Sequence, residues 1–268
     1  MSTASAYERA RSEGRAALVG YLPAGYPDHD GAVDALKVMV DAGCDVIEIG
    51  LPYTDPVMDG PVIQAAAQAA LEGGTRTTDV LRTVEAVAAT GVPTLVMTYW
   101  NPVERYGVEK FAASLADAGG AGLITPDLTP DFAPEWIAAA DEHDLDKVFL
   151  VSPSSTDERI TMTTAECRGF VYATAVMGVT GARTTTSGLA GPLVERTKRL
   201  TAQPALPVGV GLGVSNGAQA ADVAQFADGV IVGSAFVRTL LDHRDDRAAG
   251  LAALRTLTED LARGVRGG

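Results

Sequence analysis

The sequence predicts an α/β fold, a single (β/α)8 barrel (TIM barrel) with extra helices that includes residues 1–268 as one domain. Eight short apolar segments typical of buried strands recur along the 268 residues, and each is followed by a helical segment. Eight such units in about 250 residues are typical of this barrel. An open doubly wound sheet is the alternative, but the turn at residues 22–25, Leu-Pro-Ala-Gly, is no dinucleotide-binding fingerprint.

Each expected strand is a short run of apolar, often β-branched residues that ends at a turn signal. The first run ends at Pro-Ala-Gly, and the second ends at Gly50, before a loop with two prolines and two aspartates. Apolar residues at nearly every position indicate burial on both faces, as in a parallel sheet. The strands are expected, in order, at residues 16–22, 46–50, 94–98, 122–125, 148–151, 170–173, 208–211 and 230–232.

The expected helices alternate with these strands and are recognised by apolar residues at intervals of three and four. In the first, Val33, Leu36 and Val40 follow this spacing, and Gly43 ends the segment. Pro61 stands in the first turn of the next helix, a position that suits proline. The helices are expected at residues 31–42, 62–71, 78–89, 108–118, 133–142, 157–164, 192–200 and 218–226, and helical patterning fills 235–262.

Charge and cysteine content exclude several classes of partner. The chain has 21 basic and 34 acidic residues, a formal charge of −13, and would repel nucleic acid and anionic lipid. The two cysteines, Cys44 and Cys167, cannot form a disulfide framework and are interpreted as small core residues. No segment has the apolar centre of a signal peptide or a transmembrane length, so a cytoplasmic protein without a membrane partner is expected.

The segment 46–64 carries the candidate catalytic residues. Glu48 lies in the middle of an apolar strand, with no basic residue near it in sequence, and a carboxylate is costly to bury without a reason. We therefore favour a catalytic carboxyl group there over a packing role. Asp59, eleven positions on at the end of the loop, could face Glu48 across a pocket. The alternatives are that Asp59 caps the following helix and that Asp55 forms an Asx-turn, which we favour for Asp55.

Three glycine-bearing turns follow the sixth, seventh and eighth strands, at residues 178–181, 211–213 and 233–234. Backbone N–H groups at a helix N-terminus, approached closely over glycine, bind phosphate without a cationic side chain. Barrels often place a phosphate group after strands seven and eight. The alternative is that these are only tight turns and that Ser234 is only a helix cap. Because the three turns cluster on consecutive strands, the sequence favours a phosphate site.

The remaining side chains narrow the chemistry. None of the four lysines stands at the carboxyl end of a strand, so a Schiff-base mechanism is not expected (Lys37, Lys110, Lys147, Lys198). The three histidines do not cluster, so no metal site is expected (His29, His143, His243). Three tyrosines end the first, third and sixth strands and could be core or site residues (Tyr21, Tyr99, Tyr172). What remains is acid–base chemistry by Glu48 and Asp59 on a phosphorylated substrate.

Five blocks of the sequence resemble the α subunit of tryptophan synthase. The first, IEIGLPYTDPVMDGPVIQ at residues 47–64, is long and specific for that family. The others are MTYWNP at 97–102, GLITPDL at 122–128, GFVYATAVMGVTGAR at 169–183 and VGVGLGVS at 208–215. Together the matches cover nearly the whole chain. The resemblance implies retro-aldol cleavage of indole-3-glycerol phosphate to indole and glyceraldehyde 3-phosphate.

The resemblance also implies a role for individual residues. Glu48 matches the carboxyl group that protonates indole C3 and handles the glycerol hydroxyl proton. Asp59 matches the second carboxylate, which stabilises positive charge on the indole nitrogen, and Thr180 a threonine that bonds to Asp59 when its loop closes. Tyr172 matches a pocket tyrosine near Glu48. The positions that match the indole lining are Tyr21, Tyr99 and Leu212, and those that match the phosphate cradle are Gly181, Gly213, Gly233 and Ser234.

Four positions depart from the family pattern. Leu212 stands where phenylalanine is usual, which would loosen stacking on the indole, and the other three are Ala175 for serine, Tyr26 for aspartate and Thr129 for proline. None removes a proton carrier or a phosphate donor, so activity is expected to survive.

The family resemblance further implies an αββα heterotetramer in which indole passes to a β subunit. The cofactor pyridoxal phosphate would belong to that partner, with none in this chain, and the loops at 52–59 and 177–188 would signal toward it. Three alternatives stay open: another phosphate-binding barrel such as an indole-3-glycerol phosphate synthase, whose strand-end lysines are missing here; a non-catalytic subunit that only activates a β partner; and a free-standing producer of indole.

Overall fold

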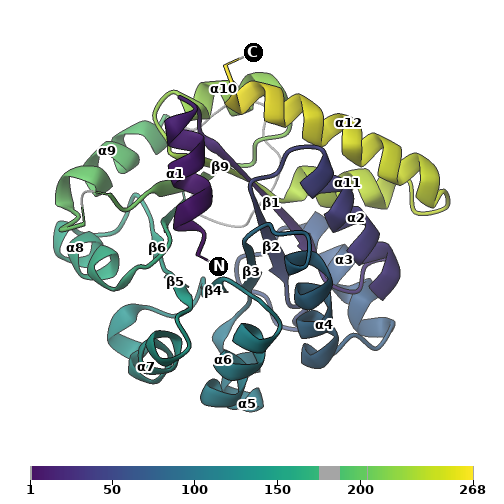
Figure 1. Ribbon diagram of the computed structural model, residues 1–268, viewed down its shortest axis with the longest axis horizontal. Helices are drawn as coiled ribbons and strands as arrows, with labels where there is room; N and C mark the ends of the chain where they lie inside the picture. Colours follow the sequence, from purple (N-terminus) through teal and green to yellow (C-terminus); the bar gives the residue numbers. More distant parts are fainter. Residues whose placement is uncertain (1, 175–187, 204, 268) are drawn as a thin grey trace.

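The structure is a computed structural model that describes residues 2–174, 188–203 and 205–267. Its strands pair in parallel throughout and curl into a nearly closed barrel surrounded by helices (Figure 1). The predicted barrel is confirmed, and the open doubly wound sheet is excluded. The strands are β1 Ala17–Pro23, β2 Val46–Gly50, β3 Thr94–Met97, β4 Gly122–Ile124, β5 Asp146–Val148, β6 Leu150–Val151, β7 Val171–Thr174, β8 Val208–Gly211 and β9 Gly229–Val232.

The helices cover the outside of the barrel. They are α1 Ala4–Ser12, α2 His29–Asp41, α3 Pro61–Glu72, α4 Thr77–Ala88, α5 Trp100–Tyr106, α6 Val108–Asp117, α7 Pro134–Glu142, α8 Asp157–Glu166, α9 Ala190–Leu200, α10 Gly217–Ala224, α11 Ser234–Asp242 and α12 Arg247–Val265, with a 3-10 turn at Pro130–Phe132. The helical patterning expected at 235–262 is therefore two helices. Neither α1 nor α5 was expected from the sequence.

The barrel closes through a strand that is interrupted at Phe149. The sheet order is β5-β4-β3-β2-β1-β9-β8-β7-β6, so its two ends are consecutive pieces of the chain on either side of Phe149. The first piece pairs with β4 and the second with β7, and the Phe149 carbonyl accepts a 3.1 Å hydrogen bond from the Tyr172 N–H. The single strand predicted at 148–151 is thus two short strands, β5, which pairs with β4, and β6, which pairs with β7.

Two apolar cores lie on the two sides of this sheet. The larger fills the space between the strands and the surrounding helices. The smaller lies inside the barrel, where Val19, Val46, Leu95 and Ile231 meet Tyr7 of α1. Ala6, Tyr7 and Ala10 of that helix are buried, so α1 closes the N-terminal end of the barrel. In Figure 1, α1 lies within the ring of helices, in front of the strands.

Asp146, at the start of β5, holds the beginning of the chain against this end of the barrel. Its fully buried carboxylate accepts hydrogen bonds from Ser2 Oγ at 2.8 Å, the Thr3 N–H at 2.7 Å and Thr3 Oγ1 at 2.6 Å. The guanidinium of Arg168 lies 3.6 Å away. A buried carboxylate with this many donors is compensated for its lost hydration.

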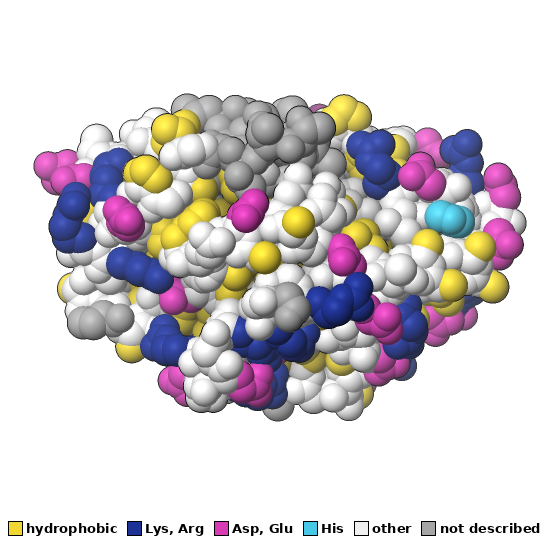
Figure 2. All heavy atoms as spheres, turned by 90° about the horizontal axis from the view of Figure 1, so that it is seen from above, with side chains coloured by type: hydrophobic (Ala, Val, Ile, Leu, Met, Phe, Trp, Pro, Cys, Tyr) yellow, Lys and Arg dark blue, Asp and Glu magenta, His cyan; other side chains and the backbone are white. Residues whose placement is uncertain are grey.

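Charges of both signs are distributed over the surface. Basic and acidic side chains lie interspersed on the face that Figure 2 shows. No helix within the described residues is long and apolar enough to cross a bilayer.

Candidate active site

Glu48 lies on β2 with its side chain inside the barrel. The side chain is 1 % exposed, and its Oε1 has no hydrogen-bond partner among the described residues. Burial raises the pKa of Glu48 from 4.5 to about 8, because the apolar interior disfavours the charged form. At neutral pH the group is therefore mostly protonated. An acid with a pKa near the working pH is well suited to proton transfer.

Two of the sequence-predicted tyrosines lie near this carboxyl group. Tyr21 on β1 is directly opposite Glu48 in the β1–β2 register. Burial raises the pKa of Tyr21 well above its ordinary value, and the charges of Asp59 and then Glu48 raise it further. Burial and the charge of Glu48 also raise the pKa of Tyr172 on β7. The two phenols therefore stay protonated and can donate hydrogen bonds in this site.

Glycines on neighbouring strands leave room for these rings. A Cβ atom added at Gly50 would lie 2.7 Å from Tyr21 Cε2, and one added at Gly211 would lie 2.8 Å from Tyr172 Cε1. Such distances are shorter than carbon–carbon contact allows. Glycine in a strand interior often marks a close approach of this kind.

Asp59 lies at the end of the loop between β2 and α3. Tyr99 Oη donates a 3.0 Å hydrogen bond to Asp59 Oδ1 and accepts one of 3.0 Å from the Met58 N–H. Burial raises the pKa of Asp59, and the Tyr99 hydrogen bond partly opposes that rise. Helix α3 begins at Pro61 with Gly60 at its N-cap position, and the Asp59 carboxylate bonds to Tyr99 instead, so the predicted alternative that Asp59 caps this helix is wrong. Tyr99 itself contacts Tyr53 at 5.4 Å between ring centroids.

Two of the three glycine-bearing turns lie next to each other. Gly211 of β8 pairs with Ile231 of β9, so the loops that follow these strands are neighbours. Gly213 has a φ of +75°, a conformation that glycine adopts readily. Gly233 precedes the first residue of α11, the buried Ser234. The N-terminus of α11 thus opens between these turns, with the arrangement that favours an anion.

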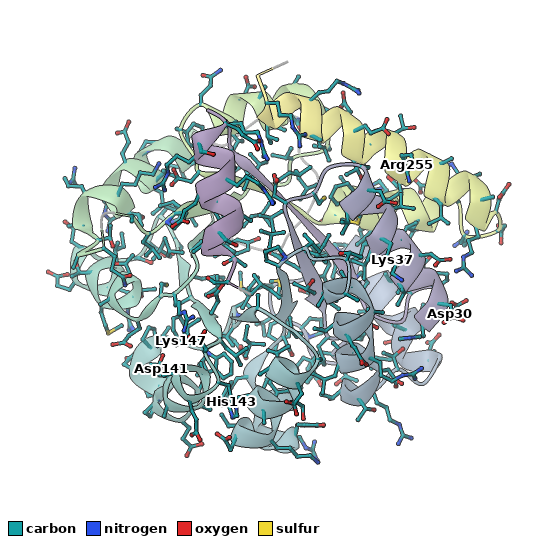
Figure 3. All side chains as sticks on the ribbon, viewed as in Figure 1. Asp30, Lys37, Asp141, His143, Lys147 and Arg255 are labelled. Atoms are coloured by element: carbon teal, nitrogen blue, oxygen red, sulfur yellow. The ribbon has the colours of Figure 1, made fainter. Side chains whose placement is uncertain are left out.

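Some predicted positions cannot be placed. Thr180, Gly181 and Ala175, with the turn at 178–181, lie outside the described residues. Leu212, the position that matches a phenylalanine, is buried directly after β8. Three of the four lysines lie in helices (Lys37, Lys110, Lys198), whereas Lys147 is the middle residue of the short strand β5 rather than preceding a strand. Figure 3 shows Lys37 on α2 and Lys147 beside Asp141, with which it forms an ion pair. No group of residues that could hold a metal ion occurs among the described residues.

The sequence placed Asp127 in a loop at this end of the barrel but did not single it out as a site residue. Its carboxylate accepts hydrogen bonds of 3.0 and 3.1 Å from the Trp100 N–H, at the start of α5. This contact joins the loop after β4 to the loop after β3, which carries Tyr99. The signal in the sequence would have been an aspartate directly after a strand, next to a proline.

Comparison with known proteins agrees with this geometry. Residues 7–266 match the family described as "Tryptophan synthase alpha chain". The chain is 63 % identical over 261 residues to the tryptophan synthase alpha chain of Salinispora arenicola, covering 97 % of this chain and 96 % of that one. It is 60 % identical, with the same coverage, to that of Acidothermus cellulolyticus. Tryptophan synthase from Mycobacterium tuberculosis superposes with a TM-score of 0.92 at 55 % identity, covering 99 % and 98 % of the two chains.

A second crystal structure of the M. tuberculosis enzyme, in its aminoacrylate-bound form, gives a TM-score of 0.89 at 52 % identity over 99 % of this chain and 100 % of that one. Both the sequence and the fold are matched over nearly the full length, including β2, β8 and β9, which carry the candidate site. The chain therefore belongs to the tryptophan synthase α-chain family, the lyases that cleave indole-3-glycerol phosphate to indole and glyceraldehyde 3-phosphate and pass the indole to a β subunit.

Proposed function

We propose that Glu48 and Asp59 are the two catalytic carboxyl groups of this lyase. One observation supports the pairing most directly: both groups raise the pKa of the same buried phenol, Tyr21. Glu48 is paired with Tyr21 on the adjacent strand, and Asp59 lies in the loop that follows β2. Two carboxyl groups that act on one side chain in this way can also act on one small substrate.

Glu48 starts the reaction as an acid. With a pKa of about 8 it carries a proton at neutral pH and donates that proton to C3 of the indole ring. The resulting positive charge extends to the ring nitrogen, where the Asp59 carboxylate stabilises it. The Tyr99 hydrogen bond favours the ionised form of Asp59, as this role requires.

Glu48 then acts as a base. Its carboxylate accepts the proton of the hydroxyl group on the carbon bonded to C3, and the bond between that carbon and C3 breaks. The electron pair of this bond restores the aromatic indole, while the carbon that carried the hydroxyl group becomes the aldehyde of glyceraldehyde 3-phosphate. Glu48 finishes protonated, as it began, so no co-reactant is needed. In this family pyridoxal phosphate belongs to the β subunit, and the α reaction uses side chains alone.

The remaining site residues bind the two ends of the substrate. Tyr21, Tyr99, Tyr172 and Leu212 line the indole in this proposal. The phosphate group is held by backbone N–H groups around Gly213, Gly233 and Ser234, together with Gly181. Thr180 bonds to Asp59 when its loop closes, which excludes water and aligns the carboxylate. In this proposal residues 1–268 form one domain that works in the cytoplasm, where the buried free thiols of Cys44 and Cys167 would stay reduced.

Paired substitutions test the assignment. In Glu48→Gln and Asp59→Asn, cleavage of indole-3-glycerol phosphate should fall by about three orders of magnitude or more, because each removes a proton-transfer or charge-stabilising group. Binding of an analogue without the glycerol hydroxyl groups should be retained, since the phosphate is held by other loops. Asp55→Asn, which changes an exposed carboxylate in the same loop, is the matched control and should remain active.

Full activity in either site variant would refute the catalytic roles. An inactive wild-type chain that still binds the analogue and accelerates a β subunit would favour the regulatory alternative. Loss of analogue binding in Glu48→Gln would contradict the placement of the phosphate on loops that Glu48 does not contact.

A further inference from the structure

The barrel interior contains two buried polar atoms without a hydrogen-bond partner among the described residues, Glu48 Oε1 and Tyr7 Oη. Both side chains are 1 % exposed. Buried polar atoms nearly always have a partner, either in the protein or in an ordered water molecule. Two such atoms inside one barrel therefore point to a shared partner.

Tyr7 reaches the interior from α1, at the N-terminal end of the barrel. Its ring lies between two strands at glycine positions: a Cβ atom added at Gly209 would lie 2.7 Å from Tyr7 Oη, and one at Gly229 would lie 2.6 Å from Tyr7 Cε1. Gly209 is opposite Tyr172 in the β7–β8 register. The Tyr7 hydroxyl thus lies beside the β8 residue that pairs with Tyr172.

An aromatic column connects Tyr7 to the site. The Tyr7 and Phe170 ring centroids are 5.2 Å apart, and those of Phe170 and Tyr172 are 6.5 Å apart. The apolar residues around them exclude bulk water, so a hydrogen bond formed there is strong.

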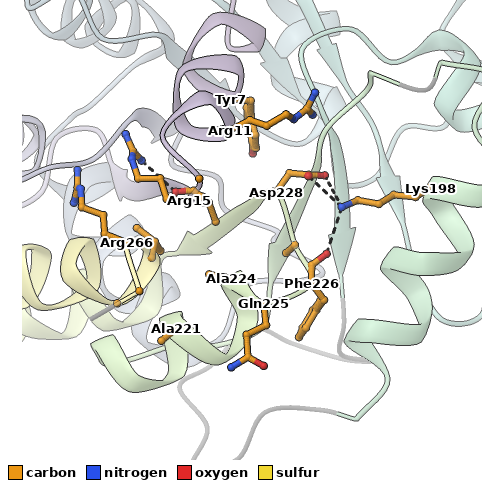
Figure 4. Close-up of a pocket in the computed structure, with 16 residues that line it drawn as sticks. Tyr7, Arg11, Arg15, Lys198, Ala221, Ala224, Gln225, Phe226, Asp228 and Arg266 are labelled. Carbon is orange, nitrogen blue, oxygen red and sulfur yellow. Dashed lines mark hydrogen bonds and ion pairs between the residues drawn. The ribbon is translucent and has the colours of Figure 1, made fainter.

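Below Tyr7 lies a groove of about 410 Å³ whose walls include Tyr7, Arg15, Lys198 and Asp228 (Figure 4). The carboxylates on this side already have partners. Asp228 is 3.0 Å from Lys198 Nζ and accepts a 2.8 Å hydrogen bond from the Val208 N–H. Asp45 accepts bonds of 2.7 and 2.9 Å from the Arg15 guanidinium.

Glu48 is the carboxyl group with the strongest influence on Tyr7. Burial raises the pKa of Tyr7 well above its ordinary value, and the charge of Glu48 raises it more than those of Asp228 and Asp45 do. The Tyr7 hydroxyl therefore keeps its proton and can donate it in a hydrogen bond toward Glu48.

We propose that Tyr7 is a positioning residue for Glu48, whose Oε1 it holds through one bridging water molecule inside the barrel. The bridge fixes the carboxyl rotamer and leaves the other oxygen to face the substrate. A water molecule with a donor on one side and an acceptor on the other has the minimum number of partners that buried waters need. The inference rests on the proposed role of Glu48.

The proposed bridge predicts in which direction the pKa of Glu48 changes when Tyr7 loses its hydroxyl group. Glu48 is faced by Tyr7 from α1, Tyr21 from β1 and Tyr172 from β7, and Asp59 lies in the loop above. A donor that bonds to the ionised carboxylate lowers its pKa, so its removal raises the pKa of Glu48 further. Because Glu48 must begin protonated, kcat/KM falls as pH rises through this pKa, and the fall should move to higher pH.

The test is Tyr7→Phe, which removes one oxygen and keeps the ring, studied in the chain assembled with its β subunit. Tyr106→Phe is the matched control, since Tyr106 packs on Phe111 at the outside of the barrel. We expect the alkaline fall of kcat/KM to move up by about half a pH unit to one unit in Tyr7→Phe and to stay in place in Tyr106→Phe.

A spectroscopic measurement keeps the test independent of folding and of turnover. The carbonyl stretching band of protonated Glu48, identified by its loss in Glu48→Gln, should move to higher frequency in Tyr7→Phe, as expected for a weaker hydrogen bond. A pH profile and a band that both coincide with wild type would overturn the inference. Undiminished activity in Glu48→Gln would instead overturn the proposed role of Glu48, so the two failures are distinguishable.

Discussion

The phenol of Tyr99 donates a 3.0 Å hydrogen bond to Asp59 Oδ1 across 40 residues of sequence. The Tyr99 hydroxyl oxygen also accepts a hydrogen bond from the Met58 N–H, so one side chain from the loop after β3 holds both the backbone of the loop that carries Asp59 and its carboxylate. No helix or strand fixes Asp59, because residues 51–60 form a loop. The proposed orientation of Asp59 thus depends on Tyr99.

Tyr99→Phe should lower kcat about tenfold or more, because it removes a hydrogen bond that favours the Asp59 carboxylate and aligns it. The loss should be largest at low pH, since the pKa of Asp59 rises further and the group protonates sooner. The control is Tyr53→Phe, which removes only the 3.1 Å bond from Asn101 Nδ2. Steady-state kinetics as a function of pH would check this; an equal loss in both variants would contradict it.

Gly211→Ala should displace the ring of Tyr172, because the added Cβ would lie 2.8 Å from Cε1 and 2.9 Å from Cζ. We expect kcat/KM to fall about tenfold, since misplaced lining residues misalign the substrate. Gly191→Ala in α9 is the control, with open space around the new methyl group. If kcat/KM of Gly211→Ala stays at the wild-type value, then Tyr172 does not line the indole as proposed.

Glu48→Gln should change how stability depends on pH. Below about pH 4.5 the wild-type carboxyl group is protonated in both the folded and the unfolded state. Between about 4.5 and 8 the unfolded chain ionises while the folded one keeps its proton, so wild-type stability falls as pH rises, and above 8 the loss is complete. The full loss corresponds to about 4 to 5 kcal/mol.

Glutamine does not titrate, so the variant should lack this fall and be stabilised relative to wild type more at pH 9 than at pH 4. Denaturant unfolding at several pH values gives the comparison. Parallel stability curves for the two proteins would show that the folded-state pKa of Glu48 is close to its ordinary value.

Asp146→Asn should lower the free energy of unfolding by about 2 to 4 kcal/mol, because the buried donors of Thr3 and the half-buried Ser2 hydroxyl lose a charged acceptor. Asp144→Asn is the control: this side chain is 87 % exposed, pairs with Arg168 at 2.6 Å, and occupies a left-handed conformation (φ 58°) that asparagine tolerates. Its substitution should cost less than about 1 kcal/mol. Equal effects, measured by urea unfolding, would contradict a special role for Asp146.

The local patterns predicted much of the fold. The strands 46–50 and 208–211 were expected at the residues where they occur, because glycine and proline mark their ends. The interruption at Phe149 could not be expected, since it arises from pairing with β4 on one side and β7 on the other. The helix α1 was missed because its polar face dominates the composition. Its buried residues, Ala6, Tyr7 and Ala10, do follow helical spacing.

For the site, the sequence identified which residues matter more readily than how they are held. An unpaired glutamate in an apolar strand was visible without any coordinates, and its burial and raised pKa agree with that interpretation. The contacts of Asp59 with Tyr99 and of Tyr7 with the interior join distant parts of the chain, so only the folded structure reveals them. The capping role considered for Asp59 was wrong because its carboxylate bonds instead to Tyr99, which is 40 residues away in the sequence.

The attachment of the first residues to Asp146 affects the order in which the protein can be completed. Thr3 leaves the ribosome early, but the carboxylate that anchors it is synthesised 143 residues later, and the Phe170 ring on which Tyr7 packs comes later still. The nascent N-terminal segment therefore has no docking surface until well over half of the chain exists. The N-terminal end of the barrel can therefore close only late in synthesis, although α1, the helix that closes it, is the first to be translated.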